Sequence, residues 1–331
     1  MIVSLYVDDL IFTGNDLKTL ENFKAAIMKE FEMSHLGELH HFLGIKVEQS
    51  KSGIFISQEK YAVEVLRKFN MEHANPVTTP CVTGLKLSKN GEEKMVDTTM
   101  FRSLIGNLMY LTATQPDIMF AVSLVSRFME KPFSNPWEAA KRILRYVKGT
   151  LDYGIYYEAN VPIKLVGYTD SDLEGSCDDS RSTSGYVFNL GGGVVSWSSK
   201  KQPIVVLSTT ESEYIAASLA GSQIVWLRGI LESLSFKEHA LTTLFCDNKS
   251  TISVSKDPVF HGRSTHLRLR FHFLRDLVNE GDIDITYCPS EKQLADIFTK
   301  PLGGPTFLRN VAALGVKSKF NLREAFDGKL N

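Results

Sequence analysis

Apolar residues in the first part of the chain follow strand-like and helix-like patterns in turn. Two runs of strand-forming residues flank a pair of aspartates at positions 8 and 9, which predicts a hairpin. Later segments place apolar side chains at helical spacing or alternate as in strands. In chain order, the pattern predicts strand, strand, helix, strand, strand and helix at 2–7, 10–13, 17–32, 42–48, 53–56 and 59–69. We therefore expect a small α/β unit over residues 1–75.

A stretch without hydrophobic periodicity, residues 76–97, follows this unit. It contains two prolines and the polar run Lys89-Asn-Gly-Glu-Glu-Lys94, so we predict a surface linker. Residues 98–152 then show helical spacing, with breaks at Gln115-Pro116 and at 133–136. The last of these helices is basic on one side. The middle of the chain therefore predicts a small all-helical unit.

A third unit is predicted over residues 153–302, where strands come first and then alternate with helices. The clearest strands are expected at 165–169, 185–190, 194–198, 242–246 and 282–287. A long helix is expected at 209–234, and another from about residue 292. Three leading strands followed by alternating strands and helices predict a mixed sheet flanked by helices, an α/β fold within a chain that is α+β overall.

Acidic side chains gather where these strands end and where the long helix begins. The candidates are Asp170, Asp172, Glu211, Glu213, Asp247 and Asp296. A single aspartate at a strand end is most often a turn or cap residue, but together these residues can converge at one edge of the sheet. A cluster of oxygen ligands suits Mg²⁺ or Mn²⁺ rather than zinc. Two such ions about 4 Å apart would serve hydrolysis of a phosphodiester.

The two glutamates of the long helix can be told apart by spacing. Ser208-Thr-Thr-Glu211 fits a capping box, in which Glu211 folds back to the start of the helix. Residues 211 and 213 lie about 200° apart around a helix, so they cannot share a face. Glu213 shares its face with a stripe of small apolar residues suited to packing on a sheet. We therefore expect Glu213 to be the ligand, with Glu211 as its rival.

Composition and charge narrow the classes of protein. The 331 residues are 43% hydrophobic and 23% charged, enough for two or three compact units. Net charge is −1, which excludes a strongly basic protein overall but not a basic face. Four cysteines without C-x-x-C spacing indicate a reducing compartment, and we expect an intracellular protein, in cytoplasm or nucleus. No run of 18 apolar residues is present, so no transmembrane helix and no membrane partner are expected.

The most basic stretch of the chain is residues 260–275. Its arginines suit phosphate contacts, although they can also simply line the outer face of a helix. Lys200 and Lys201 follow a predicted strand and face the same two interpretations. The candidate nucleic-acid contacts are Lys200, Lys201, Arg263, Arg268 and Arg270.

Several motifs resemble a known family. Leu5-Tyr-Val-Asp-Asp-Leu-Ile-Phe-Thr-Gly14 is similar to the catalytic hairpin of reverse transcriptases. Six further segments resemble the ribonuclease H end of Ty1/copia-type retrotransposon Pol polyproteins. They are Gly167-Tyr-Thr-Asp-Ser-Asp172, Ser182-Thr-Ser-Gly-Tyr186, Ser196-Trp-Ser-Ser-Lys-Lys-Gln202, Leu207-Ser-Thr-Thr-Glu-Ser-Glu-Tyr214, Cys246-Asp-Asn-Lys-Ser250 and Gln293-Leu-Ala-Asp-Ile-Phe-Thr-Lys-Pro301. The resemblance extends from residue 1 to about residue 302.

This resemblance implies a domain order and a set of site residues. Residues 1–75 would be a partial reverse-transcriptase palm, 76–97 a linker, 98–152 a thumb-like unit, 153–302 a ribonuclease H-like domain and 303–331 a tail. The family's ribonuclease H acids fall on Asp170, Glu213, Asp247 and Asp296, which would hold two Mg²⁺ ions, with Mn²⁺ as a substitute. Asp8 and Asp9 match the metal-binding aspartates of the palm. In the wider superfamily a histidine near the site assists product release, a role that would fall to His261 or His266.

Departures from the family pattern limit what is expected of this chain. The palm's remaining aspartate and its fingers would precede Met1, so we expect a truncated or processed product without autonomous reverse transcription. Leu173-Glu-Gly175 replaces the common Trp-Ala-Gly, and the segment around His261 also differs. The expected activity is metal-dependent endonucleolytic hydrolysis of RNA in RNA·DNA hybrids, and the expected partners are the hybrid and the N-terminal part of the polyprotein. The alternative is an inert remnant that at most binds nucleic acid.

Overall fold

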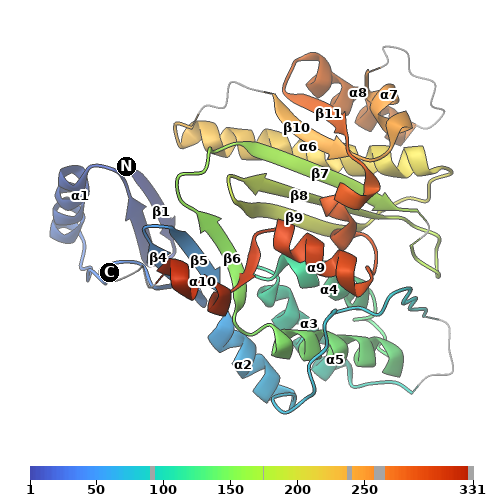
Figure 1. Cartoon of the computed structure of the whole chain (residues 1–331), viewed down its shortest axis with the longest axis horizontal. Coiled ribbons are helices and arrows are strands. Elements are labelled where there is room, and N and C mark those ends of the chain that lie inside the picture. Colours follow the sequence, from blue (N-terminus) through green and yellow to red (C-terminus); the bar gives the residue numbers. More distant parts are fainter. Residues whose placement is uncertain (90–93, 174, 237–240, 257–264, 327–331) are drawn as a thin grey trace.

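The computed structural model describes residues 1–89, 94–173, 175–236, 241–256 and 265–326. Side chains are described for all of these except 265–269, 271 and 323–326. Two five-stranded sheets and a two-stranded hairpin organise this part of the chain. Figure 1 shows one five-stranded sheet with its helices (green to orange) above a helical layer, and the N-terminal hairpin (blue) at the left of the view.

The sheet that carries the predicted site has the strand order β9-β8-β7-β10-β11. Its strands are β7 (Leu165–Asp172), β8 (Thr183–Leu190), β9 (Gly193–Lys201), β10 (Thr242–Cys246) and β11 (Ile283–Tyr287). The first three form an antiparallel meander, while β10 runs parallel to both β7 and β11. The mixed sheet predicted from the sequence is therefore confirmed.

Helices cover both faces of this sheet. On one face, α6 (Thr209–Ser233) packs along β7 and β8 through Tyr214, Ala217 and Ala220, which are fully buried. Small side chains on α6 let α7 (Lys249–Lys256) and α8 (Thr265–Asn279) approach it closely. By length and composition α6 could also cross a membrane, but 56% of its apolar window is buried against the protein. It therefore packs as a core helix.

The opposite face of the sheet rests on the helical unit. This unit comprises α2 (Glu59–Lys68), α3 (Thr98–Leu111), η1 (Pro116–Ile118), α4 (Met119–Ser126), α5 (Ser134–Gly149) and α9 (Gly304–Ala313). Val187 of β8 and Val194 of β9 belong to the same apolar core as these helices, whereas Phe188 faces α6. Alternate residues of β8 thus point to opposite layers, as strand geometry requires. The predicted break at 115–116 is confirmed, whereas the break predicted at 133–136 is wrong for residues 134–136, which form the first turn of α5.

The second sheet, in the order β12-β6-β5-β4-β3, joins distant parts of the chain. Its strands are β3 (His41–Phe42), β4 (Ile45–Ser50), β5 (Gly53–Ser57), β6 (Tyr153–Glu158) and β12 (Val316–Ser318). The strand predicted at 42–48 is broken by a tight turn at Leu43 and Gly44, which both have positive φ. The boundary predicted at residue 153 differs from the structure, because β6 pairs with β5 and not with the sheet of β7 to β11.

The C-terminal tail predicted from residue 303 is also part of the fold. It forms α9, the strand β12 that pairs with β6, and α10 (Lys319–Phe326). Just before it, the helix expected from residue 292 is replaced by two short 3₁₀ turns, η2 (Ser290–Lys292) and η3 (Leu294–Phe298). The Gln293 side chain accepts a hydrogen bond from the Ala295 amide, which ends one turn and begins the next.

The N-terminal hairpin stands apart from both larger sheets. It pairs β1 (Ile2–Tyr6) with β2 (Asp9–Thr13), and α1 (Leu17–Glu30) follows it. The predicted strands and helix are confirmed, and Asp8 lies in the turn between the strands. Leu5 and Val7 are more than two-thirds exposed, which is unusual for apolar residues of a hairpin.

Candidate metal centre

Four carboxylates from four separate elements meet at the end of β7. Asp170 lies near the end of β7, Glu213 in the first turns of α6, Asp247 directly after β10, and Asp296 in η3. Because β7 and β10 are parallel neighbours, their carboxyl ends lie side by side. Oxygen atoms of Asp170, Asp247 and Asp296 all lie within 4.8 Å of one another. Glu213 joins the cluster through Asp247, with ligand atoms again within 4.8 Å.

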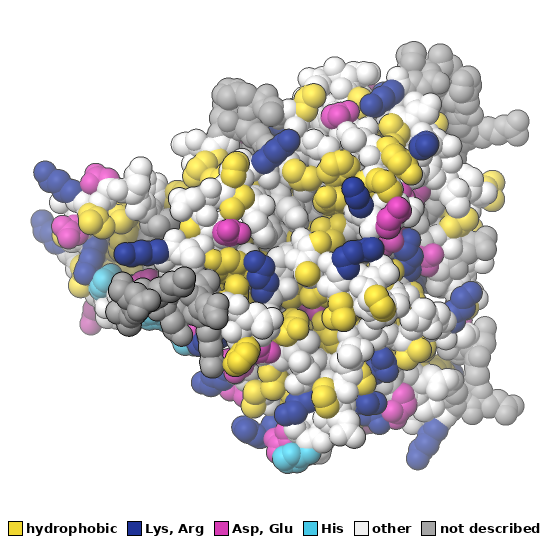
Figure 2. All heavy atoms as spheres, in the orientation of Figure 1, with side chains coloured by type: hydrophobic (Ala, Val, Ile, Leu, Met, Phe, Trp, Pro, Cys, Tyr) yellow, Lys and Arg dark blue, Asp and Glu magenta, His cyan; other side chains and the backbone are white. Residues whose placement is uncertain are grey.

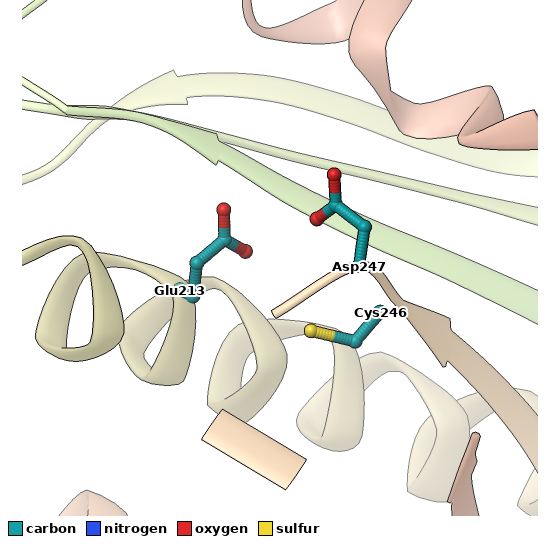
Figure 3. A group of neighbouring side chains, drawn as sticks. All are labelled: Glu213, Cys246 and Asp247. Carbon is teal, nitrogen blue, oxygen red and sulfur yellow. The ribbon is translucent and has the colours of Figure 1, made fainter. Parts of the chain in front are cut away.

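Glu213 contributes a buried carboxylate of which only one oxygen has a hydrogen-bond partner. Figure 3 shows its carboxylate and that of Asp247 reaching toward the same space from α6 and from the end of β10. The Ser171 amide donates to Glu213 Oε1 over 3.2 Å, while Oε2 is buried with no hydrogen-bond partner. Burial, followed by Asp170 and Asp247, raises the pKa of Glu213 well above its ordinary value. A cation beside Oε2 would relieve this cost.

Asp170 and Asp296 are held by a threonine and a lysine from one segment. Thr299 donates its hydroxyl hydrogen to Asp170 Oδ2. Lys300 Nζ lies 2.8 Å from Asp296 Oδ1 and 3.6 Å from Asp170 Oδ2. Burial and the neighbouring Asp170 raise the pKa of Asp296 to about 7, against the opposing effect of Lys300. Burial would lower the pKa of Lys300, but the surrounding carboxylates raise it instead.

A glycine opposite Asp170 allows η3 to lie flat on the sheet. Gly185 of β8 pairs with Asp170 across the strands. A Cβ at this position would lie 2.7 Å from Thr299 Cγ2 and 2.9 Å from Phe298 Cβ. Only glycine therefore permits the close approach that brings Asp296 to Asp170.

Asp247 is the more exposed member of the cluster. Its Oδ2 accepts a hydrogen bond from the Ser290 hydroxyl over 3.0 Å. The preceding residue, Cys246, is fully buried and its sulfur points toward α6 (Figure 3). Burial raises the pKa of the Cys246 thiol, which disfavours the thiolate form in the metal-free protein. The donors available at the centre are carboxylate oxygens.

The two rival acids of the sequence prediction occupy other positions. Glu211 Oε2 accepts from the Leu207 amide over 2.8 Å, and the Glu211 amide donates to Ser208 Oγ over 3.2 Å. This is a capping box closed one residue earlier than expected. Asp172 lies two residues beyond Asp170, beside Gly175, and is outside both carboxylate groups. The structure thus brings Asp170, Glu213, Asp247 and Asp296 together.

The chemistry of the cluster fits divalent cations that prefer oxygen. Burial first, and then repulsion from the neighbouring carboxylates, raises the pKa values of Glu213 and Asp296, and Lys300 opposes this rise only in part. Oxygen ligands from carboxylates match Mg²⁺ or Mn²⁺. One cation between Asp170, Asp247 and Asp296, and another between Glu213 and Asp247, would use both groups of ligand atoms.

The remaining predicted site residues lie elsewhere. Asp8 and Asp9 are exposed at the N-terminal hairpin, away from this cluster. Lys200 and Lys201 end β9, and Lys201 forms an ion pair with Asp179 at 2.6 Å. Arg270 is half-buried on α8. The side chains of Arg268 and His266 are not described, and His261 and Arg263 lie outside the described residues.

Basic side chains form no continuous stripe on the face shown in Figure 2. Lysine and arginine are interspersed there with acidic and apolar groups. This distribution agrees with the balanced net charge of the chain.

Sequence reasoning missed the roles of Thr299 and Lys300. A signal was present, because Lys300 follows Asp296 by four residues, the spacing of ion pairs on a helical turn. The hydroxyl contact from Thr299 to Asp170 joins residues 129 positions apart. Only the folded chain shows that contact.

Comparisons with known proteins agree with these observations. Residues 1–83 match the family described as reverse transcriptase (RNA-dependent DNA polymerase). The chain is 38% identical over 312 residues to the retrovirus-related Pol polyprotein from transposon RE2 of Arabidopsis thaliana, covering 94% of this chain and 21% of that relative. It is 32% identical over 219 residues to a putative transposon Ty5-1 protein of Saccharomyces cerevisiae, covering 65% of this chain and 71% of that protein.

One solved structure similar to part of the chain is LC11-RNase H1 in complex with an RNA/DNA hybrid. It shares 17% identity with a TM-score of 0.32, covering 41% of this chain and 94% of that one. The chain spans 21% of the length of the Arabidopsis polyprotein, so it corresponds to one portion of such a protein. On the sequence relatives, this chain belongs to the Pol polyprotein family of copia-type retrotransposons.

Proposed function

We propose that the chain is a ribonuclease H that cleaves the RNA strand of RNA·DNA hybrids with the help of two Mg²⁺ ions, for which Mn²⁺ can substitute. The observation that carries this proposal is the convergence of four carboxylates from β7, α6, β10 and η3 at one point. Structural acids are normally paired or exposed, whereas Asp170, Glu213 and Asp296 are buried, and Lys300 forms ion pairs with only two of them, Asp170 and Asp296. Perturbed acids clustered in this way are typical of functional sites.

Each residue has a definable part in such a site. Asp170, Glu213, Asp247 and Asp296 would hold the ions, which supply an activated water and charge stabilisation for the leaving 3′ oxygen when bound. The Ser171 amide and the Ser290 and Thr299 hydroxyls fix the orientations of three of these carboxylates. Lys300 neutralises part of the negative charge and keeps Asp170 and Asp296 close.

Selection of RNA would come from contacts to 2′-hydroxyl groups, which DNA lacks. Ser171, Ser184 and Lys200 lie in register across β7, β8 and β9. Two strand spacings place Lys200 about 10 Å from β7, within reach of the backbone of a bound duplex. We propose that Lys200 and Lys201 contact that backbone.

The test is hydrolysis of a hybrid labelled on each strand in turn, with Mg²⁺. We expect cleavage of the RNA strand only, abolished by Asp170→Asn and by Asp247→Asn. Asp276→Asn, an exposed acid on α8, is the matched control and should keep full activity. Calcium should bind without supporting cleavage. A folded protein that cleaves neither strand would support the inert remnant instead, and full activity in Asp170→Asn would refute the metal assignment.

Reverse transcription by this chain alone is not part of the proposal. Asp8 and Asp9 are exposed on a two-stranded sheet. We propose that they complete a polymerase site only together with the N-terminal part of a longer polyprotein. Primer extension by the isolated chain would refute this view.

A further inference from the structure

A second feature lies beside the carboxylate cluster, in a cavity of about 360 Å³ between the helical unit and the nuclease-like sheet. One wall comes from α4 and the linker, through Arg127 and Lys86. The other wall comes from the end of β7 and from residues 299–306, including Lys300 and the start of α9. Nothing in the proposed cleavage step uses this space.

The lining is rich in groups that bind anions. Lys86, Arg127 and Lys300 supply three positive charges, and Asp172 is the one acidic side chain among the described lining residues. Hydroxyl groups are contributed by Thr183, Thr299 and Thr306. Gly303, the N-cap of α9, also lines the cavity. Among the described lining residues, three cations therefore stand against one acid, in a protein whose total charge is −1.

Arg127 is the strongest indication that the cavity binds an anion. Its side chain is half-buried, and its Nη2 donates to Thr183 Oγ1 over 3.0 Å. Its Nε is buried without a hydrogen-bond partner, and no carboxylate of the described residues forms an ion pair with it. Burial lowers the pKa of Arg127, which Asp179 and Asp172 oppose. A desolvated guanidinium without an anion is costly, and its fork of donors matches a phosphate.

The cavity is continuous with the carboxylate cluster. Lys300 lines the cavity and also contacts Asp170 and Asp296. Asp172, on the cavity wall, is two residues from Asp170 along β7. A strand whose scissile phosphate lies at the carboxylates would therefore bring a neighbouring phosphate to the cavity.

We propose that this cavity is a binding subsite for a backbone phosphate of the strand being cleaved, held by Arg127 and Lys86. The inference rests on the proposed function for the identity of the strand. The shared chemistry is a phosphate ester, which a free mononucleotide could also supply. The subsite links the helical unit to the nuclease-like sheet through the substrate.

Its test is the salt dependence of hybrid binding, measured by fluorescence anisotropy in Ca²⁺ between about 50 and 200 mM salt. Loss of one phosphate contact makes the slope of log K against log salt shallower by about 0.7–0.9. We expect this change in Arg127→Gln and in Lys86→Gln. Lys86 is exposed, so its variant does not depend on refolding of a buried site. Lys164→Gln, an exposed lysine before the other end of β7, is the matched control and should keep the wild-type slope apart from any general effect of charge.

A second measurement locates the contact. Single RNA phosphates are replaced in turn by neutral methylphosphonates, and binding is compared in wild type and Arg127→Gln. One position near the cleavage point should weaken wild-type binding several-fold and leave Arg127→Gln unaffected. Equal sensitivity of both proteins at every position would overturn the subsite.

Cleavage in Mg²⁺ is measured separately, so the two proposals can fail independently. Unchanged salt slopes in an actively cleaving protein would refute the subsite alone. A shallower slope in both variants of a protein that does not cleave would support the subsite and refute the nuclease. Calorimetry with adenosine monophosphate and with inorganic phosphate tests whether the cavity binds a free phosphate compound instead of a strand. If Arg127→Gln abolishes binding of these compounds but leaves the salt dependence of hybrid binding unchanged, the assignment to a strand is overturned.

Discussion

Neutralising Asp296 should stabilise the metal-free protein at neutral and alkaline pH. The folded chain holds this carboxyl with a pKa of about 7, because it is buried beside Asp170. The unfolded chain has the ordinary value of 3.8, so the folded state binds more protons between these two pH values. The free energy of unfolding therefore falls as pH rises from about 4 to about 7, and stays low above that.

The size of this loss follows from the two pKa values. At 1.36 kcal/mol per pKa unit, the difference between 3.8 and about 7 corresponds to about 4 kcal/mol. Asp296→Asn removes the titrating group. Between pH 4 and pH 8, the free energy of unfolding of this variant should therefore fall by about 4 kcal/mol less than that of wild type. Mg²⁺ should stabilise wild type at pH 8 by binding the folded state, and Asp296→Asn much less.

Urea denaturation followed by tryptophan fluorescence, with a chelator and then with Mg²⁺, measures both effects. Asp276→Asn, an exposed acid, serves as the control and should follow wild type. If Asp296→Asn loses as much stability as wild type when the pH rises, the pKa of the Asp296 carboxyl is not raised in the folded protein. The proposed electrostatics of the carboxylate cluster would then be wrong.

Two further substitutions test the geometry of the site. Glu211→Gln should cost about 0.5–1 kcal/mol of stability through the weakened cap and leave cleavage intact. Glu213→Gln should abolish cleavage without loss of stability. The opposite pattern would mean that Glu211 is the ligand and Glu213 the cap. Gly185→Ala should push Thr299 and η3 away from β7, cost about 1–3 kcal/mol and lower cleavage at least tenfold. Gly229→Ala, whose new methyl would meet nothing within 4 Å, should be neutral or slightly stabilising in the same denaturation and cleavage assays.

Local patterns in the sequence were enough to predict the elements of the nuclease-like sheet. Alternation gave β7, β8 and β9, and helical spacing gave α6 with Glu213 on its buried face. The arguments that separated Glu211 from Glu213 used only the period of the helix and the chemistry of its first turn. Both are local properties.

Pairings between distant segments could not be predicted in this way. β6 was not among the strands predicted, and a strand pattern alone would not have named its partners, which are β5 and β12. The helix predicted from residue 292 was wrong, because the Gln293 side chain and the close packing of η3 on Gly185 favour short turns. The cavity beside Arg127 forms where the linker, α4, the end of β7 and residues 299–306 meet, and no single stretch of sequence contains all of these.

The pairing of β12 with β6 has a consequence for shortened forms of the protein. β12 is an edge strand that covers Tyr153–Ile155 of β6. A chain ending near residue 302 would keep its carboxylates but leave that stretch of β6 with unpaired backbone groups. Open strand edges recruit other strands, and self-association follows. The C-terminal residues that form β12 thus protect the protein against aggregation. Their removal should lower solubility while leaving the four carboxylates in the chain.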